Sequence, residues 1–515
     1  MLVKNIHRII LVAIIAVIVA FNYYGEYCAH CDGYGWDGCF TYKAMILNGW
    51  DEYASGCISD YHSHRMLHFL MIHYIIKALS LPFSPHNVML TCSIANTVML
   101  AVAVFFFFRI SNKEGWRRRT EIIVFSFLFF NFHVLKFMGY CPVMTDMPAF
   151  ALCVALVYYC ISKNKVAIVV TGLISVVVFP ILSLMAFLML CLPDEPLRSF
   201  SDKEKGKECY NANRILNAIM RCLITVWLPL AFGAYIFFRL YIKNVGDYKS
   251  VFIVRYPENV YISAAAILAY VIFYWFATRA LQVDFSAMLK PFRERRRLCF
   301  SIVAVAVFAA IYTLPTVLCY KGNFSLVNEF AQICQFPATD ILIFLETPFV
   351  YLGLGFVFLM IKWKNVCREV MACGTGAYAI LVLAVVFLAD IETRKIIYFY
   401  IFLLPMLAKI IEKLNISRAR AITIVAIQLF LSFFWFRINV AGIKEAFATY
   451  DNEVYMQMPA QRYYMFQGPW QSHEMYLIFM FVALIFFFTW RSILKTESSC
   501  GETEENNKAE NNKLK

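Results

Sequence analysis

Apolar positions in this chain come in long runs rather than in alternation with polar ones. Runs of about 20 apolar residues recur from the N-terminus to about residue 490 and are separated by short polar segments. A helix of that length crosses a hydrocarbon core of about 30 Å. The expected membrane spans are residues 9–23, 87–108, 121–138, 147–161, 218–241, 259–278, 299–319, 341–361, 372–389, 395–411, 421–436 and 475–490. The pattern predicts an all-α, polytopic transmembrane helical bundle with about twelve spans.

Two apolar stretches do not fit single crossings. Residues 166–192 are too long for one comfortable span and carry Pro180 near the middle, so we expect two short arms of a hairpin. If residues 66–80 crossed the membrane, the basic loop 109–119 would face the outside, against the usual charge bias. We therefore expect residues 66–80 to form an interfacial helix at the outer surface, within a first outer loop spanning 24–80.

Composition and charge agree with the membrane class. Hydrophobic residues make up 61% of the chain and charged residues 16%, and the mean hydropathy is +0.64, all typical of membrane proteins. The net charge of +13 comes from basic residues in short loops, which indicates cytoplasmic loops and no nucleic-acid partner. The transmembrane domain is expected over residues 1–492. The polar, low-complexity segment 493–515 is expected to be a disordered cytoplasmic tail.

This topology places several charged residues together on the outer side, at helix ends: Asp32, Asp37, Arg65, Asp146, Glu392 and Arg394. Charged groups near membrane depth are costly and are often functional.

Each of these residues also has an ordinary structural explanation. Asp146 precedes Pro148 and suits the start of a helix, while Glu392 and Arg394 could pair with each other or with lipid headgroups. Asp-Gly pairs are common in solvated turns. Trp36 and its aromatic neighbours Phe40 and Tyr42 favour a binding role for the second aspartate of the first loop, Asp37.

The first outer loop is also rich in cysteine, with Cys28, Cys31, Cys39 and Cys57. The Cys28–Cys31 spacing resembles half of a zinc site, but the second half is missing at the usual distance. One or two disulfides that brace the loop are therefore expected, and no metal.

Three short motifs resemble those of bacterial members of the GT-C superfamily of membrane glycosyltransferases. Residues 37–44 (DGCFTYKA), followed by residues 61–67 (YHSHRML), are similar to the first-loop pattern of that superfamily. Residues 145–149 (TDMPA) are similar to its second acidic site, and residues 390–394 (DIETR), with Pro405 beyond them, to its late acidic-arginine step. The motifs are spread over about 400 residues, and their order and common side give them weight.

The resemblance implies a GT-C-like bundle that transfers a sugar from a polyprenyl-phosphate donor to a cell-envelope glycan or lipid acceptor. Asp37 would be the catalytic base, Asp146 would orient the acceptor or share that role, and Arg65 and Arg394 would hold the donor phosphate. The supporting residues would be Asp32, Trp36, Tyr42, Tyr61, His64 and Glu392. Neither a metal nor another cofactor is required. The implied location is a bacterial inner membrane, surrounded by lipid, with the site facing the periplasm or exterior.

Two other functions fit parts of the same pattern. A lipid-linked polysaccharide polymerase or ligase also joins lipid-linked sugars at the outer face with the help of arginines. A multi-span transporter or lipid flippase usually carries ionisable groups in the middle of its spans and repeated halves. The charges here gather at one face and no internal repeat is evident, which favours an enzyme.

Overall fold

The computed structural model describes residues 2–513 except 36, 57, 198–218, 221, 224–259, 282, 320–339, 391, 415 and 449–472. The described residues form helices joined by turns, and no strand occurs among them. The all-α class predicted from the apolar pattern is confirmed for this part of the chain. Most of the expected span 218–241, and most of the segment 437–474 between the last two expected spans, lie outside the described residues.

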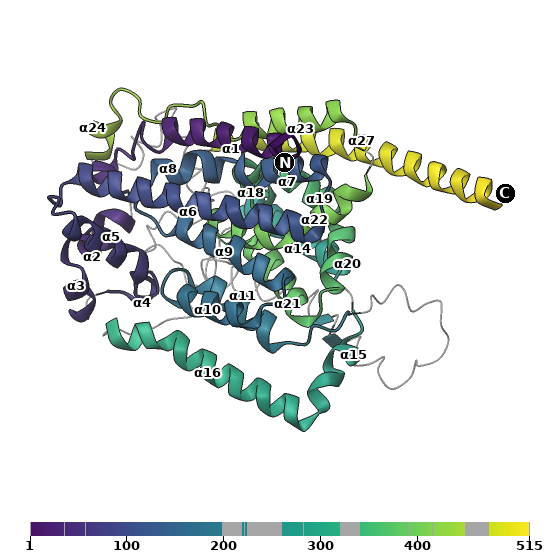
Figure 1. Cartoon of the computed structure of the whole chain (residues 1–515), viewed down its shortest axis with the longest axis horizontal. Helices are drawn as coiled ribbons and strands as arrows, with labels where there is room; N and C mark the ends of the chain where they lie inside the picture. The colour runs from purple at the N-terminus through teal and green to yellow at the C-terminus, as the bar shows by residue number, and fades with distance from the viewer. Residues whose placement is uncertain are drawn as a thin grey trace.

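The N-terminal part of the chain forms a series of helices that includes residues 24–80, the segment expected to be the first outer loop (Figure 1). In chain order these are α1 (Leu2–Asn22), η1 (His30–Gly33), η2 (Gly38–Tyr42), α2 (Lys43–Asn48), α3 (Trp50–Ala54), α4 (Asp60–Ser63), α5 (Met66–Ala78), α6 (Pro85–Glu114), α7 (Arg118–Phe129), η3 (His133–Phe137), α8 (Met138–Tyr140), α9 (Asp146–Ile161), α10 (Lys165–Val176) and α11 (Pro180–Cys191).

The C-terminal part continues the bundle. Its described elements are α14 (Val260–Arg279), α15 (Phe285–Leu289), η7 (Lys290–Arg293), α16 (Arg295–Cys319), α18 (Ile343–Leu352), α19 (Leu354–Ile361), α20 (Trp363–Met371), α21 (Thr375–Phe387), η9 (Thr393–Lys395), α22 (Ile396–Lys413), α23 (Arg418–Leu431), α24 (Ile443–Ala448) and α27 (His473–Lys513). Helix α27 extends through residues 493–513. The disorder expected for this tail is therefore not seen in the fold and stays a prediction.

Local sequence signals account for several helix ends. Ser84 caps α6 by accepting a hydrogen bond from the Asn87 backbone N–H, and Pro85 occupies the first turn, where its missing N–H costs nothing. The helix ends at Gly115, which adopts the left-handed conformation at φ 66° that glycine tolerates best. Ser417 caps α23 in the same way as Ser84 caps α6.

The expected count of about twelve spans is wrong for the described residues. Four helical segments there are long and apolar enough to cross a membrane: Asn5–Asn22, Pro85–Glu114, Leu298–Cys319 and Glu474–Leu494. The pair Arg118–Phe129 and His133–Tyr140, bent by 51°, makes a fifth if it is counted as one broken span. Seven other apolar helices have 10–17 residues, shorter than the roughly 20 that a straight crossing needs.

The physical reason is that continuous apolar sequence does not require one continuous helix. Gly353, at φ 67° and ψ −142°, separates α18 from α19, although residues 341–361 read as one apolar run. The buried Gln428 of α23 satisfies this break: its Nε2 donates to the carbonyls of Leu352 (3.0 Å) and Phe130 (2.8 Å), and its Oε1 accepts from the Gly355 N–H (3.2 Å). One amide thus serves two helix breaks, since Phe130 ends α7.

The expected hairpin is confirmed as two short helices. Residues 165–191 fold into α10 and α11, which pack against each other, and Pro180 opens the second helix. The segment expected at the interface forms the 13-residue helix α5, which packs on α2 and α6. Its position relative to a membrane stays a prediction.

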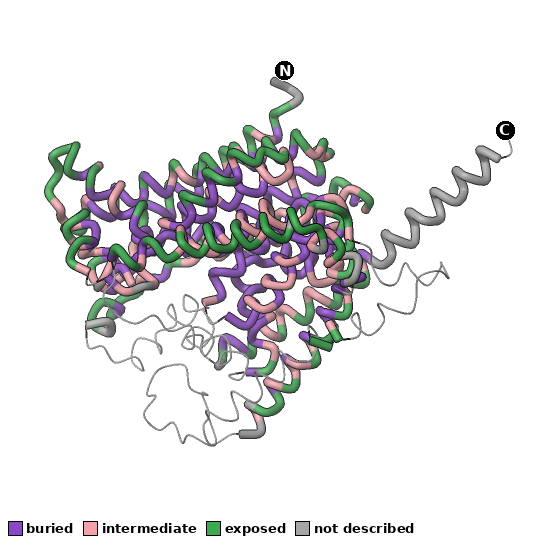
Figure 2. The backbone as a smooth tube through the Cα atoms, turned by 90° about the horizontal axis from the view of Figure 1, so that it is seen from below, coloured by how far each residue is buried: buried purple, intermediate pink, exposed green. Residues whose placement is uncertain are grey.

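Buried residues concentrate inside the bundle, and exposed residues lie on the outer helices (Figure 2). Helix α16 lies at the edge of the bundle in Figure 1 and exposes many large apolar side chains, as a lipid-facing helix would. Helix α22 packs against both α7 and α9 in the interior. The polar residues at one end of α9 and α22 make up the candidate site.

Candidate functional site

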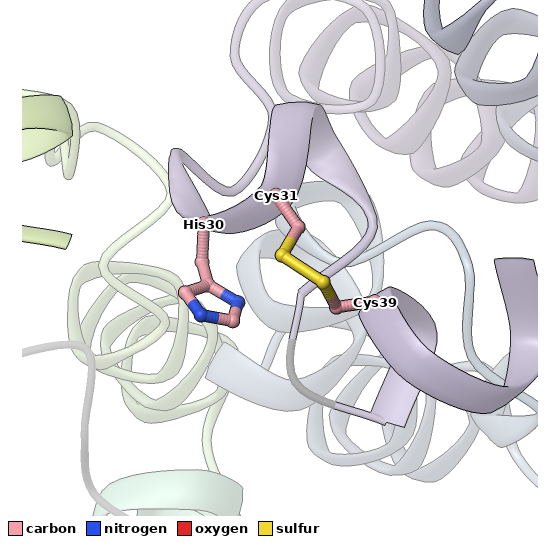
Figure 3. Close-up of side chains that lie close together, drawn as sticks. All are labelled: His30, Cys31 and Cys39. Atoms are coloured by element: carbon pink, nitrogen blue, oxygen red, sulfur yellow. A yellow bond between two sulfur atoms is a disulfide. The ribbon is translucent and has the colours of Figure 1, made fainter. Parts of the chain in front are cut away.

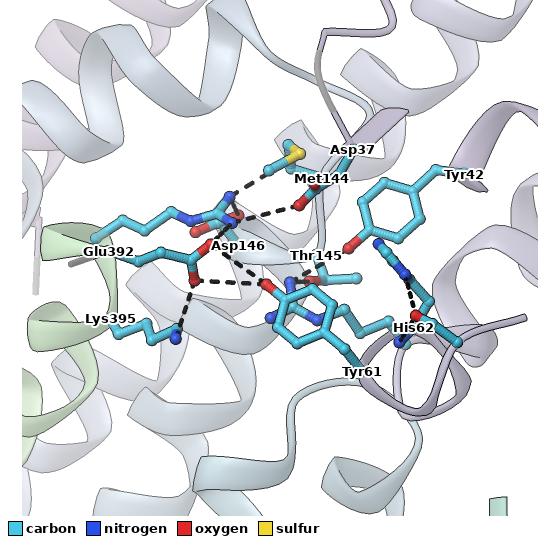
Figure 4. Close-up of polar contacts among 12 residues, drawn as sticks. Asp37, Tyr42, Tyr61, His62, Met144, Thr145, Asp146, Glu392 and Lys395 are labelled. Atoms are coloured by element: carbon cyan, nitrogen blue, oxygen red, sulfur yellow. Dashed lines mark hydrogen bonds and ion pairs between the residues drawn. The ribbon is translucent and has the colours of Figure 1, made fainter. Parts of the chain in front are cut away.

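Five of the six charged residues expected on the outer side meet at helix ends, and Asp32 is the one that lies apart (Figure 4). Asp146 is the first residue of α9, Arg394 lies in η9 directly before α22, Arg65 precedes α5 and Asp37 precedes η2. The backbone N–H and C=O groups at a helix end have no partner within the helix. Polar side chains can bind these groups, so helix ends are suitable positions for polar clusters.

Arg394 is the centre of the cluster. Its Nη1 donates to Asp146 Oδ2 (3.2 Å) and its Nη2 to Glu392 Oε1 (3.0 Å). Nη2 also lies 3.7 Å from Asp37 Oδ2. The guanidinium is buried, so a single forked cation is shared by three carboxylates from different parts of the chain.

Arg65 is the second buried guanidinium. Its Nη1 donates to the hydroxyls of Tyr42 (3.3 Å) and Thr145 (3.2 Å). Its planar group lies over the ring of Tyr61 (4.0 Å to the centroid) and faces Phe179 (4.8 Å), an arrangement favoured for arginine over aromatic rings. Its Nε is buried without a hydrogen-bond partner. This atom is an unused donor at the site.

Glu392 connects Arg394 to a third cation, Lys395. The Tyr61 hydroxyl donates to its carboxylate (3.4 Å), and Lys395 Nζ lies 3.1 Å from Glu392 Oε2 and 3.3 Å from Asp390 Oδ2. Burial by itself raises the pKa of Glu392, but the positive charges of Arg394 and Lys395 outweigh it and hold that pKa well below its usual range. Glu392 is therefore ionised at neutral pH.

The two aspartates differ in exposure. The Asp37 side chain is 33% exposed and only loosely held by Arg394, whereas the Asp146 side chain is 1% exposed. The Oδ1 atom of Asp146 has no hydrogen-bond partner and lies 3.9 Å from Nε2 of His133. Asp37 is thus the carboxylate that a bound molecule can reach, and Asp146 supports the cluster from inside.

Sequence reasoning missed three residues of this region. Lys395 directly follows Arg394 and was not singled out, and His133 is a polar residue within the apolar run 121–138, which was the signal that could have found it. His62 also lies at the site: its ring meets the rings of Tyr42 (5.3 Å) and Tyr61 (5.0 Å) edge-on. Burial lowers the pKa of His62 to about 4, so its imidazole is neutral at pH 7.

Three of the expected supporting residues lie elsewhere or outside the described residues. His64 points away from the cluster, with Nδ1 donating to the Val176 carbonyl (3.1 Å) and Nε2 3.2 Å from Thr316 Oγ1. Asp32 is exposed, at a positive φ of 53° in the cysteine-rich turn, and makes no ion pair among the residues described. Trp36 lies outside the described residues.

A disulfide between Cys31 and Cys39 closes the turn before the site (Figure 3). One of the disulfides expected in the first loop is therefore confirmed, while Cys28 is free and Cys57 lies outside the described residues. His30 lies close to both sulfur atoms, and the three side chains together have the spacing of a metal site. Because the disulfide occupies both sulfurs, only the His30 imidazole could bind a metal in this state.

The cluster as a whole holds four carboxylates and three cations among the described residues: Asp37, Asp146, Asp390 and Glu392 against Arg65, Arg394 and Lys395. The accessible carboxylate can accept a proton. The buried guanidinium groups beside it can stabilise negative charge that develops during a reaction.

Comparison with known proteins adds no family to this geometry: no family model, curated protein or solved structure matches the chain.

Proposed function

We propose that the chain is a membrane glycosyltransferase that moves a sugar from a polyprenyl-phosphate donor to a glycan or lipid acceptor. The observation that carries the proposal is the convergence of Asp37, Asp146 and Glu392 on Arg394, with Arg65 beside them. These residues come from the three short motifs that resemble the GT-C superfamily. The proposed location is a bacterial inner membrane, with the site at the outer face.

Asp37 is the proposed base because it is the most accessible carboxylate of the cluster. It would take the proton of the acceptor hydroxyl while the acceptor oxygen forms its bond to the anomeric carbon. The bond between that carbon and the phosphate oxygen would break, and the electron pair would leave with the polyprenyl phosphate. The proton that neutralises Asp37 compensates the negative charge gained by the departing phosphate.

The two arginines are the proposed phosphate ligands. Burial lowers the pKa of Arg65 and the positive charge of Arg394 lowers it further, although the neighbouring tyrosines and Glu392 together raise it more. A phosphate placed between the two guanidinium groups would relieve the repulsion between them and accept forked hydrogen bonds. The 3.7 Å contact between Arg394 and Asp37 is the longest of the three carboxylate contacts of Arg394. Phosphate binding would therefore separate this pair first.

The test compares Asp37→Asn with Asp32→Asn in purified protein supplied with polyprenyl-phosphate sugars. Loss of a general base slows transfer by about 10²–10⁴-fold, so Asp37→Asn should lose at least 100-fold. Asp32→Asn removes the same charge from the same loop outside the cluster and should stay within about two-fold of wild type. Both variants should elute and unfold like wild type.

Full activity of Asp37→Asn would remove this residue from the mechanism. Mass spectrometry of copurifying lipid tests the reaction class separately. A monosaccharide-phosphate lipid supports the transferase, a pyrophosphate-linked oligosaccharide supports a polymerase or ligase, and the absence of both supports a transporter or flippase.

A further inference from the structure

A second polar site lies at the opposite ends of α7 and α22. A cavity of about 370 Å³ opens there between the first turn of α7 and the last turn of α22. Its lining includes three consecutive arginines, Arg117, Arg118 and Arg119, and the apolar side chains of Ile123 and Ile416. The cavity lining is therefore both strongly basic and apolar.

Two of the arginines shape the cavity. The backbone N–H of Arg117 donates to Glu412 Oε1 (2.6 Å), and its Nε lies 3.3 Å from Glu412 Oε2. Arg119 Nη1 donates to the Ile416 carbonyl (3.0 Å). These contacts join α7 to the end of α22 and to the turn that follows it.

Arg118 is different from its two neighbours. It is exposed, lines the cavity, and makes no ion pair within the described part of the chain. Three arginines against the single carboxylate of Glu412 leave the cavity with an excess of two positive charges. An anion is the ligand that this excess selects.

The position of the cavity points to a lipid as the source of that anion. Helix α22 begins two residues after Arg394, and Glu412 lies 16 residues beyond Ile396, which at 1.5 Å per residue is roughly 24 Å along the axis. Arg117 also lies three residues beyond Glu114, the last residue of a helix long and apolar enough to cross a membrane. If the candidate site lies at one membrane surface, the cavity lies at headgroup level near the other.

We propose that this cavity binds the headgroup of an anionic phospholipid. The phosphate lies against Arg118 and Arg119, and the acyl chains start from the half-buried Leu414 of the cavity lining. Basic pockets between helices on one membrane face recognise anionic headgroups in this way. The proposal concerns a site at the far end of α22 and does not depend on the transferase reaction.

Native mass spectrometry of the full chain in detergent tests the proposal, with phosphatidylglycerol, phosphatidylcholine and inorganic phosphate as separate probes. Wild type should retain phosphatidylglycerol in preference to phosphatidylcholine. Removing one arginine from such a surface weakens binding by roughly five-fold, so Arg118→Gln should show a five-fold higher Kd and Arg118→Gln/Arg119→Gln a roughly 25-fold higher one. Lys113→Gln removes an exposed positive charge from the preceding helix end, outside the cavity lining, and should leave the Kd unchanged.

Three results would overturn the proposal. Equal retention of the two lipids would show no headgroup selection, and equal losses in Arg118→Gln and Lys113→Gln would reduce the effect to net charge. Displacement of phosphatidylglycerol by equimolar inorganic phosphate would assign the cavity to a free anion. Because Arg118 is exposed and unpaired, its single substitution leaves the fold intact, so a loss of binding reports on the cavity itself.

Discussion

Removing Arg394 should lower the stability of the folded protein, because it leaves three carboxylates without their shared cation. At an effective dielectric constant of about 20, one contact such as Arg394 to Asp146 at 3.2 Å is worth about 5 kcal/mol of gross attraction. Breaking a buried pair by removing one partner costs about 3–5 kcal/mol, since the remaining charge stays buried. The entropy of unfolding grows with chain length, so for 515 residues this loss of free energy lowers the Tm by roughly 3–5 °C.

The assay is thermal unfolding of purified protein in detergent, with four proteins compared in a cycle. Arg394→Gln should lose the 3–5 °C. Asp146→Asn removes the most buried negative charge but leaves the guanidinium paired with Glu392, so it should lose less than half as much. The double variant Arg394→Gln/Asp146→Asn should recover part of the loss, because it removes both members of the buried pair.

A surface ion pair provides the matched control. Lys413 lies 3.0 Å from Glu369, as close as the closest carboxylate contact of Arg394, but its side chain is 72% exposed. Such pairs contribute about 0–1 kcal/mol, so Lys413→Gln should unfold within about 1 °C of wild type. Equal losses in Arg394→Gln and Lys413→Gln, or strictly additive losses in the cycle, would refute the account of Arg394 as a buried shared cation.

Three further changes follow from the same contacts. The pKa of His62 in the folded state is about 4, below the usual 6.5. The contribution of the neutral imidazole to the free energy of unfolding is therefore complete above pH 6.5 and is lost as the pH falls toward 4. The Tm of His62→Gln should consequently change less with pH over this window than the Tm of wild type. Reduction of Cys31–Cys39, which closes a loop of sequence separation 8, should lower stability by about 2–3 kcal/mol; an unchanged Tm after alkylation would contradict this. A Cβ on Gly355 would lie 1.9 Å from the Tyr400 hydroxyl oxygen, so Gly355→Ala should cost about 1–3 kcal/mol in a denaturation series, and unchanged stability would show that Tyr400 can move away.

The candidate site could be predicted from sequence better than the architecture around it. Charge asymmetry between loops assigned Asp37, Arg65, Asp146 and Arg394 to one side of the bundle, and the structure brings all four into one cluster. That assignment rests on the bias of basic loops toward the cytoplasm, and the side of a membrane that the cluster faces stays a prediction. The assignment gives the shared face of these residues but not their distances.

The number of spans could not be predicted, because the breaks depend on distant partners. Residues 341–361 form one apolar run, and the break at Gly353 is tolerated only because Gln428 of another helix supplies donors and acceptors to the backbone. Hydropathy records the apolar character of a run and carries no information about such partners.

His64 failed for a geometric reason. His62 lies in α4, and His64 is the residue that ends this helix two positions later. Side chains two positions apart on a helix point to different sides. His62 therefore faces the cluster, while His64 reaches the carbonyl of Val176. Both histidines belong to the same sequence motif, and they differ in the direction in which their side chains point.

The long sequence distance inside the cluster has a consequence for biosynthesis. Asp146 and Arg394 are 248 residues apart, and at about 5–20 residues per second a ribosome needs roughly 10–50 s to make the intervening chain. During that interval α9 already exists without its cation, so the Asp146 carboxylate must stay hydrated or protonated while the later helices are inserted. Assembly of the cluster is therefore a late step in the maturation of the protein, and a nascent chain halted before Arg394 cannot complete it.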